Sequence, residues 1–369
     1  MKVTAPHLGN LWVVLKTAFE DLGLEYVVPP FSSRRTLSLG VRYSPETVCL
    51  PFKITLGNFY EALERGAELL IMPSGRGLCR FGYYAILQER ILKDLGFQFE
   101  MIKVDLFGGR IFSVLELFKK LSGRPWPKVI KSIFFGLAKM KEIDEIEKLV
   151  QKIRAREIEK GTATKIFREA IRDIERASDF SSLRKTVKEY KERLLSVPQN
   201  KDFDPLKVGL IGEFYILLEP FSNMDIEIEL GKLGVEVRRS IYISHWTKFS
   251  LFLALLKLDE KARLHRAAMP YLSRDVGGDG WETVGHKVLD VGRYDGLIHV
   301  APFTCMPEIV ACNILPSIKT DIPLITLIFD EQMGKAGMMT RVEAFVDLLK
   351  KRREAKLRGE RRAWTSSWG

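Results

Sequence analysis

Two stretches of the sequence alternate short apolar runs with segments of helical periodicity, and this alternation constrains the fold more than any other feature. In the first stretch, residues 1–106, the apolar runs are 2–5, 25–28, 69–72 and 97–104. In the second stretch, residues 201–349, they are 207–212, 235–239, 297–301 and 322–329. Strands that alternate with helices form βαβ units and parallel sheets. We therefore expect two doubly wound α/β lobes, with ligands bound beyond the carboxyl ends of the strands.

The segment between them, residues 107–200, has no strand pattern and is rich in charge. Its apolar residues recur every three or four positions, which predicts amphipathic helices. The turn-rich string VPQNKDFDP at 197–205 marks the boundary with the second lobe. We therefore expect a helical insertion between the lobes, a helix over 223–233 capped by Asn223, and a final helix from Thr340 to about residue 353.

The charge is unevenly distributed. The chain carries 58 basic and 47 acidic side chains, a net charge of +11, yet residues 350–369 alone hold eight basic and two acidic residues. This basic C-terminal tail is typical of a solvated chain end, and the rest of the chain is nearly balanced, so we do not expect nucleic-acid binding. No apolar run has the length of a membrane span, and the N-terminus lacks the features of a signal peptide. The sequence thus predicts a cytoplasmic protein without a membrane partner.

Cysteines are few, and three of the four occur at similar places in the pattern. Cys49 and Cys305 are each followed by one residue and then proline, a residue that favours the first turn of a helix. Cys79 follows the apolar run 69–72 and precedes a helical segment. We expect all three at strand-to-helix corners, where the free N–H groups of a helix favour a thiolate. Packing in the core remains the alternative for each.

Cys312 differs from these three. It lies seven residues after Cys305 on the same expected helix, about 10 Å further along the axis, and its neighbours are apolar. We therefore favour a core role for Cys312. The five histidines show no ligand spacing, there is no GxxxxGKS/T phosphate loop, and the glycine-rich strings at 75–77 and 277–280 are weak signals.

Three long segments of the sequence resemble a known family. They are RRTLSLGVRYSPETVCLPFKITLGNFYEALERGAELLIMPSGRGLCRFGYY, GEFYILLEPFSNMDIEIELGKLGVEVRRSIY and HVAPFTCMPEIVACNILPSI, followed by TRVEAF. Together they resemble the 2-hydroxyacyl-CoA dehydratase D-component superfamily, and within it the acyl-CoA dehydratase activase-related branch, whose relatives include double-cubane cluster proteins. The resemblance covers most of the chain except the helical insertion.

The resemblance implies two flavodoxin-like or Rossmann-like lobes with an iron–sulfur cluster between them. Its ligands would be Cys49, Cys79 and Cys305, whereas Cys312 is not part of the family pattern. Three thiolates would hold a 4Fe-4S cluster with one open iron, or half of an 8Fe-9S double cubane. Thiolates are suitable ligands for such clusters.

Several residues near these cysteines are candidates for supporting roles. Arg76, Arg80 and Lys53 could offset the charge of a cluster or bind an anionic ligand, and surface or ion-paired positions are the alternative. Glu308 and one of the tyrosines Tyr83 and Tyr84 are candidate proton donors.

The sequence and the resemblance together lead to two functional hypotheses. In the first, the chain is an iron–sulfur protein for low-potential electron transfer or for reductive or dehydratase-type chemistry. It would accept electrons from a separate ATP-dependent activator protein with its own iron–sulfur cluster, and it could pair as a homodimer or with a related subunit. In the second, it is a non-catalytic cluster-carrying, maturation or scaffold protein that docks with an activator.

Overall fold

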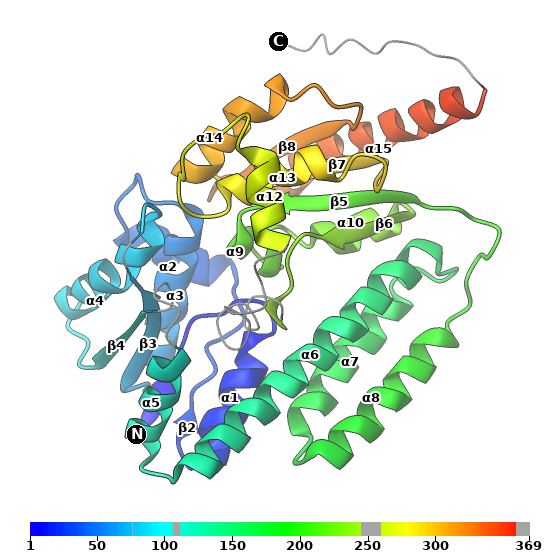
Figure 1. Cartoon of the computed structure of the whole chain (residues 1–369). Helices are drawn as coiled ribbons and strands as arrows, with labels where there is room; N and C mark the ends of the chain where they lie inside the picture. The colour runs from blue at the N-terminus through cyan, green and yellow to red at the C-terminus, as the bar shows by residue number, and fades with distance from the viewer. Residues whose placement is uncertain (76, 106–110, 245–259, 359–369) are drawn as a thin grey trace.

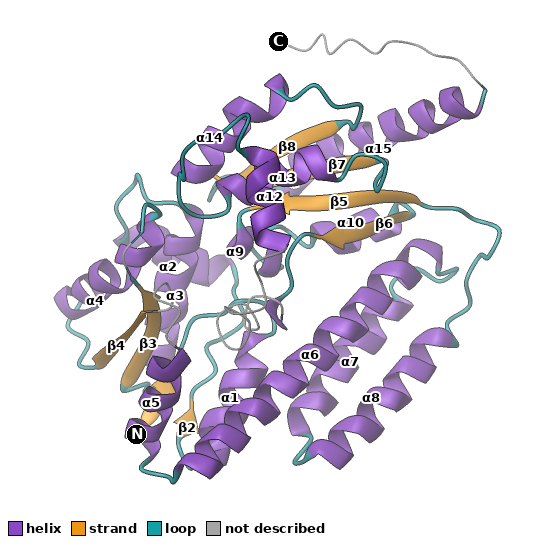
Figure 2. Cartoon of the chain, viewed as in Figure 1, coloured by secondary structure: helices purple, strands orange, loops and turns teal. Residues whose placement is uncertain are grey.

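The computed structural model of the chain describes residues 1–75, 77–105, 111–244 and 260–358. Within these residues it contains two four-stranded sheets in which every paired strand is parallel, one from each alternating stretch (Figures 1 and 2). The expected α/β fold with two doubly wound lobes is confirmed.

The first sheet has the strand order β2-β1-β3-β4. Its strands are β1 (Lys2–Thr4), β2 (Glu25–Tyr26), β3 (Leu69–Ser74) and β4 (Glu100–Asp105). Its helices are α1 (Leu11–Asp21), α2 (Arg34–Tyr43), α3 (Leu50–Glu64), the 3-10 helix η1 (Arg80–Tyr83), α4 (Tyr84–Asp94) and α5 (Ile111–Ser122). Because the strand order reverses between β1 and β3, the crevice at the carboxyl ends of these two strands is where a ligand is expected.

Helix α2 was not anticipated from the apolar pattern, and its position determines that of α3. Ser33 caps α2 in a reciprocal capping box with Thr36. The two helices approach closely at glycines: a Cβ on Gly40 would lie 1.8 Å from the carbonyl oxygen of Lys53, and one on Gly57 2.0 Å from that of Thr36. Only glycine fits at these crossings, so the pair behaves as one rigid unit.

Three long helices follow the first sheet: α6 (Trp126–Arg156), α7 (Thr162–Arg176) and α8 (Phe180–Leu195). Helix α6 packs on α1 of the first lobe and on β6 and α10 of the second (Figure 1). A continuous apolar core runs from Val13 through Ile143 and Ile146 to Val208 of the second sheet. This helical segment therefore joins the two lobes.

The second sheet repeats the topology of the first, in the order β6-β5-β7-β8. Its strands are β5 (Leu206–Gly212), β6 (Val235–Arg239), β7 (Gly296–Pro302) and β8 (Leu324–Phe329). Its helices are α9 (Phe214–Leu218), α10 (Ile226–Lys232), α12 (Glu260–Ala268), α13 (Gly280–Leu289), α14 (Met306–Ile314), η2 (Leu315–Ser317) and α15 (Lys335–Leu357).

Two helices differ from expectation at their ends. Helix α10 begins at Ile226 rather than Asn223, because Met224 and Asp225 adopt left-handed backbone angles, φ 58° and 59°. Helix α15 begins at Lys335 rather than Thr340 and continues to Leu357, into the basic segment. Residues 359–369 of that segment lie outside the described residues. Among the described helices, none is both long and apolar enough to span a membrane.

A buried ion pair connects the two lobes directly. Lys53 on α3 has a side chain only 4% exposed, and its Nζ lies 2.7 Å from Oε1 of Glu331, which follows β8. Lys53 is therefore an ion-paired residue, the alternative considered from the sequence.

We expect Lys53→Gln to lower the free energy of unfolding by about 2–3 kcal/mol, because it leaves Glu331 without its buried partner. Urea denaturation of the whole chain measures this. The matched control is Lys93→Gln, which removes an exposed pair with Glu89 one helical turn away and should cost less than about 0.5 kcal/mol. Equal losses in the two variants would contradict a structural role for the pair.

Candidate functional site

The crevice where strand order reverses in each sheet leads to a sequence-predicted cysteine. In the second sheet, β5 ends at Gly212 and β7 ends at Pro302, three residues before Cys305. In the first sheet, β3 ends at Ser74 and the chain then reaches Cys79. Cys79 and Cys305 thus occupy the expected ligand-binding position of each lobe.

All three predicted cysteines lie immediately before a helix. Cys49 is the N-cap of α3, Cys305 the N-cap of α14, and Cys79 the N-cap of the 3-10 helix η1. Proline stands in the first turn of α3 and of α14, as the sequence indicated. The expected strand-to-helix corner is wrong for Cys49, however, because α2 precedes it, so Cys49 lies at a corner between two helices.

The three thiols lie close to one another, with Cys49 and Cys305 buried and Cys79 half-buried. The pKa of Cys79 is raised to about 11, mainly by burial and in part by the proximity of Cys49. Burial is also the main reason that the pKa of Cys305 is raised, with contributions from Glu213, Glu308 and Cys49. The pKa of Cys49 is raised by burial as well. Cysteines from both lobes therefore meet at one place.

The expectation that helix N-termini favour thiolates is not met in the chain by itself. Backbone N–H groups do lower the pKa of two of the thiols. The N–H of Phe81 donates to Cys79, and the N–H of Glu308 donates to Cys305. Burial away from water and the nearby carboxyl groups raise the pKa values of these thiols by more than the hydrogen bonds lower them. The thiols are thus neutral at physiological pH unless a positively charged centre binds them.

Tyr84 is the closest polar group to Cys49. Its hydroxyl lies 2.5 Å from Cys49 Sγ, and burial raises the tyrosine pKa well above its ordinary value. The other candidate tyrosine, Tyr83, is 58% exposed and lies at the surface. Of the two, Tyr84 is the one that the structure places beside a predicted ligand.

Arg80 connects the segments that carry the three cysteines. It follows Cys79 directly, and its guanidinium donates to the carbonyl oxygen of Thr47, at 2.9 Å, and to that of Thr304. Thr47 lies two residues before Cys49, and Thr304 lies one residue before Cys305. Arg80 thus joins the three corners, while Arg76, the other candidate cation, lies outside the described residues.

We expect Arg80→Gln to loosen the cysteine corners, because charge-assisted bonds to two carbonyl groups are lost, at a cost of about 1–3 kcal/mol. Amide hydrogen exchange should become faster in residues 47–49 and 303–306. Arg90→Gln, on the exposed face of α4, is the matched control and should leave this exchange unchanged. Unaltered exchange in the Arg80 variant would contradict its connecting role.

The loop 275–280 covers the corners of both lobes. A Cβ on Gly277, which has φ +76°, would lie 2.8 Å from the backbone nitrogen of Cys79, and one on Gly278 would lie 3.1 Å from Pro307. The glycine-rich string at 277–280 therefore permits a close approach to backbone, which is a different role from phosphate binding. Thr304 is also strained, with φ 65° directly before Cys305.

Two carboxyl groups at this site, Glu213, which is buried, and Asp279, which is half-buried, were missed in the sequence. Glu213 directly follows β5 and caps α9 by accepting from the N–H of Ile216 at 2.9 Å. Asp279 accepts from the N–H of Phe214 at 3.1 Å. Burial raises the pKa of Glu213 to about 8 and that of Asp279 well above its ordinary value. The signal that could have found Glu213 is its position at the carboxyl end of a predicted strand.

Glu308 and Cys312 belong to a separate buried network. Glu308 lies 2.7 Å from Nε2 of His299 and accepts from Thr283 at 3.2 and 3.1 Å. Cys312 Sγ lies 3.6 Å from the other ring nitrogen, Nδ1. The carboxylate of Glu308 is thus held by His299 and Thr283, while its backbone N–H faces Cys305.

The donor set fits a cluster better than a single metal ion. Among the described residues, no group of three His, Cys, Asp or Glu side chains is arranged to hold one ion. An iron–sulfur cluster binds each thiolate through a different iron, so its ligands lie further apart than those of one ion. Three neighbouring cysteines, two of them buried, and nearby backbone N–H groups match this requirement.

Exposed apolar side chains occur close in sequence to Cys79 and Cys305. On the first lobe they are Leu78 and Tyr83, which flank Cys79, and on the second lobe Phe303, Met306 and Ile309, around Cys305. Phe303 is 57% and Leu78 is 59% exposed. We call these five residues the apolar collar. Apolar patches of this kind mark interaction surfaces.

The N-terminal part of the chain matches a family model. Residues 7–81 match the family described as CoA enzyme activase uncharacterised domain (DUF2229). A comparison with curated proteins gave no match. The matched segment includes Cys49 and Cys79 and ends before Cys305. Over these residues the chain is therefore similar, at a coarse level, to an activase-related family of CoA enzymes.

Proposed function

We propose that the chain is an iron–sulfur protein whose cluster is held by Cys49, Cys79 and Cys305 between the two lobes. The observation that supports this most strongly is the proximity of three cysteines from both lobes, two buried and one half-buried, each at the N-cap of a different helix. The cluster would be of the 4Fe-4S type or half of an 8Fe-9S double cubane.

When bound, such a cluster would supply a reducible centre with one iron free to engage a ligand. The residues of the chain would hold and tune it. The N–H groups of Phe81 and Glu308 would donate to the sulfurs of Cys79 and Cys305. The Tyr84 hydroxyl would donate to that of Cys49. Such hydrogen bonds stabilise negative charge at the sulfurs and raise the reduction potential.

The proposed activity is low-potential electron transfer or reductive, dehydratase-type chemistry, driven by an ATP-dependent activator with its own cluster. The sequence contains no phosphate loop of the GxxxxGKS/T type, which is consistent with a separate protein that hydrolyses ATP. The apolar collar suits docking of such a partner near the cysteines, since electron transfer requires the two centres to come close. The similarity to a CoA enzyme activase domain also supports a place in this system.

This proposal is tested by reduction with an activator. Anaerobic chain with bound cluster should give the electron paramagnetic resonance signal of a reduced cluster when activator, a reductant for the activator and ATP are all present. Omission of ATP should abolish the signal. Replacing Leu78 and Phe303 of the collar with Ser should slow reduction by the activator and leave direct reduction by dithionite unchanged. Equal rates for the double variant and the wild type would contradict the docking surface.

The alternative is a non-catalytic carrier or scaffold for a cluster. It is favoured because no cysteine lines either of two cavities in the described part of the chain, so neither is a substrate pocket at the proposed cluster. In that case the chain would form a stable complex with the activator or transfer its cluster to an acceptor protein, without turnover of any acyl-CoA. Measured turnover with an acyl-CoA or another small reducible substrate would decide against the carrier.

A further inference from the structure

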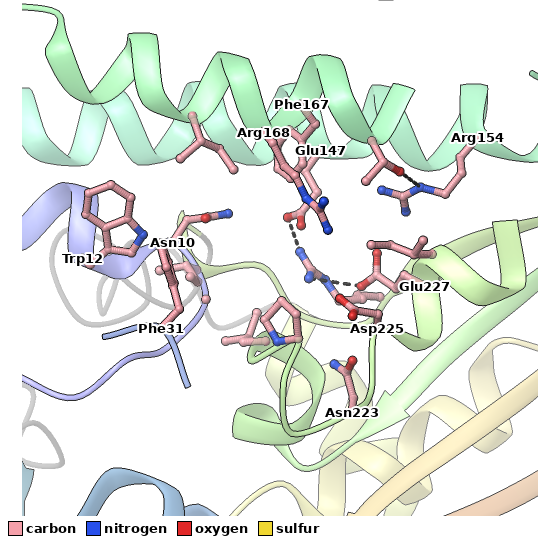
Figure 3. A pocket seen from close by; sticks show the side chains of 18 of the residues that line it. Asn10, Trp12, Phe31, Glu147, Arg154, Phe167, Arg168, Asn223, Asp225 and Glu227 are labelled. Carbon is pink, nitrogen blue, oxygen red and sulfur yellow. Dashed lines mark hydrogen bonds and ion pairs between the residues drawn. The ribbon is translucent and has the colours of Figure 1, made fainter. Parts of the chain in front are cut away.

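A cavity of about 450 Å³ lies between the helical segment and the second lobe, away from the cysteines. Its walls come from the start of α1, from α6 and α7, and from the chain around α10 and the end of β6 (Figure 3). This volume falls within the range of small-molecule sites. None of the roles described above uses it.

One end of the cavity is aromatic. Trp12 and Phe31 line it, whereas Phe167 lies beside Arg168 (Figure 3). The ring of Phe31 stacks on His7 at 5.1 Å and meets Trp12 edge-on at 6.0 Å, so its orientation is set by two neighbours, yet Phe31 is 69% exposed. An exposed aromatic ring whose orientation is fixed by its neighbours, and which lies beside a cavity, is a surface on which a planar ligand can stack.

The other end is formed by guanidinium groups. Arg154 is 5% exposed, and its aliphatic stem packs on Gly231, where a Cβ would lie 2.3 Å from Arg154 Cδ. Its Nε donates to Thr164 at 3.1 Å, and Figure 3 shows the guanidinium directed toward Arg168 and Glu147 across the cavity. Within the described part of the chain, neither Arg154, Arg168 nor Arg172 forms an ion pair with a carboxylate.

Two carboxylates at this end, Glu147 and Glu227, already form ion pairs with Arg239. The pair with Glu227 has a distance of 3.1 Å. Glu227 and Glu147 also act electrostatically on Arg154, and a third carboxylate, Asp225, lines the same cavity. The lining nevertheless carries four arginines against three carboxylates. Burial lowers the pKa of Arg154, which is the cost of holding its charge away from water.

Two further hydrogen-bond donors on the walls have no acceptor. The buried Nε1 of Trp12 and the buried Nε of Arg239, in a residue 9% exposed, lack a partner within the described chain. A buried donor left without an acceptor is costly and rare. The cavity thus combines an aromatic surface with several unsatisfied donors and a surplus of guanidinium groups.

We propose that this cavity binds a phosphate ester of a planar aromatic ring, of about mononucleotide size. The ring would stack at Phe31 and Trp12, and the phosphate would accept from Arg154 and Arg168. Guanidinium forks match the oxygens of a phosphate in pairs, which is why arginines are the usual residues for this ligand. The proposal is independent of the iron–sulfur centre, since no cysteine lines the cavity.

Isothermal titration calorimetry of the full chain with adenosine 5′-monophosphate and with phenyl phosphate tests it. We expect at least one ester to bind, with adenosine, phenol and inorganic phosphate each at least about tenfold weaker. Arg154→Gln and Arg168→Gln should each weaken binding of the ester by about tenfold. Arg168 is exposed, so its variant is not expected to disturb folding.

The matched control is Arg176→Gln, on the same helix as Arg168, where the side chain pairs with Asp173 at the surface outside the cavity. This variant should bind the ester as the wild type does. The proposal is overturned if neither ester binds, if inorganic phosphate binds as tightly as the esters, or if the affinity is the same in all three arginine variants.

Discussion

Replacing any one of Cys49, Cys79 and Cys305 with serine should remove most of the iron that the chain retains after anaerobic reconstitution. A serine oxygen is a poor substitute for a thiolate at iron, and three ligands leave no spare protein donor at the cluster. Iron and acid-labile sulfide per chain are the quantities measured, with circular dichroism to verify that each variant folds.

Cys312→Ser is the matched control for this series, because it changes the same atom in the same chain. Its sulfur contacts His299 rather than the three other cysteines, so the variant should keep wild-type iron. Loss of iron in the Cys312 variant, with retention in any of the other three, would contradict the ligand assignment.

The second large effect concerns His299 and the pH dependence of stability. The side chain is fully buried, and although burial by itself lowers its pKa, hydrogen bonds with Cys312 and Glu308 raise the pKa from 6.5 to about 9. The folded chain thus binds this proton more tightly than the unfolded chain does. The resulting stabilisation is fully present below pH 6.5 and is lost as the pH rises through 9, a change of about 3 kcal/mol.

Several other groups titrate in the same range, so the test is a difference between two proteins. The free energy of unfolding is measured by urea denaturation from pH 6.5 to 9.5 for the wild type and for His299→Gln. The free energy of unfolding of the wild type should exceed that of the variant by the largest amount at pH 6.5. This difference should become smaller toward pH 9.5. A difference that is constant or grows with pH would contradict a protonated His299 in the folded chain.

The doubly wound lobes could be predicted from the sequence because a buried parallel strand is a short apolar run. The runs at 207–212 and 235–239 correspond closely to β5 and β6. Helix α2 was missed because its sequence, RRTLSLGVRY, is short and polar overall, and only Thr36, Leu37 and Gly40 in it are buried. The local signal that could have found it is the capping box of Ser33 and Thr36, whereas its close glycine crossings with α3 depend on tertiary contacts that no local pattern contains.

The candidate site, like the fold, could be predicted only in part. The N-terminal positions of Cys49 and Cys305 could be predicted because proline two residues later marks a helix start. The raised pKa values of these thiols could not be predicted, because they result from burial and from the proximity of Glu213, which is far away in the sequence. The same is true of Arg80, whose partners Thr47 and Thr304 are brought together only by the fold.

The most direct test of the central claim is the iron and acid-labile sulfide content of the chain, purified without oxygen or reconstituted. The account predicts about four irons and four sulfides per chain, or slightly more sulfide for a double cubane, with a visible absorption that dithionite bleaches. A folded, colourless protein that binds no iron after reconstitution would contradict it.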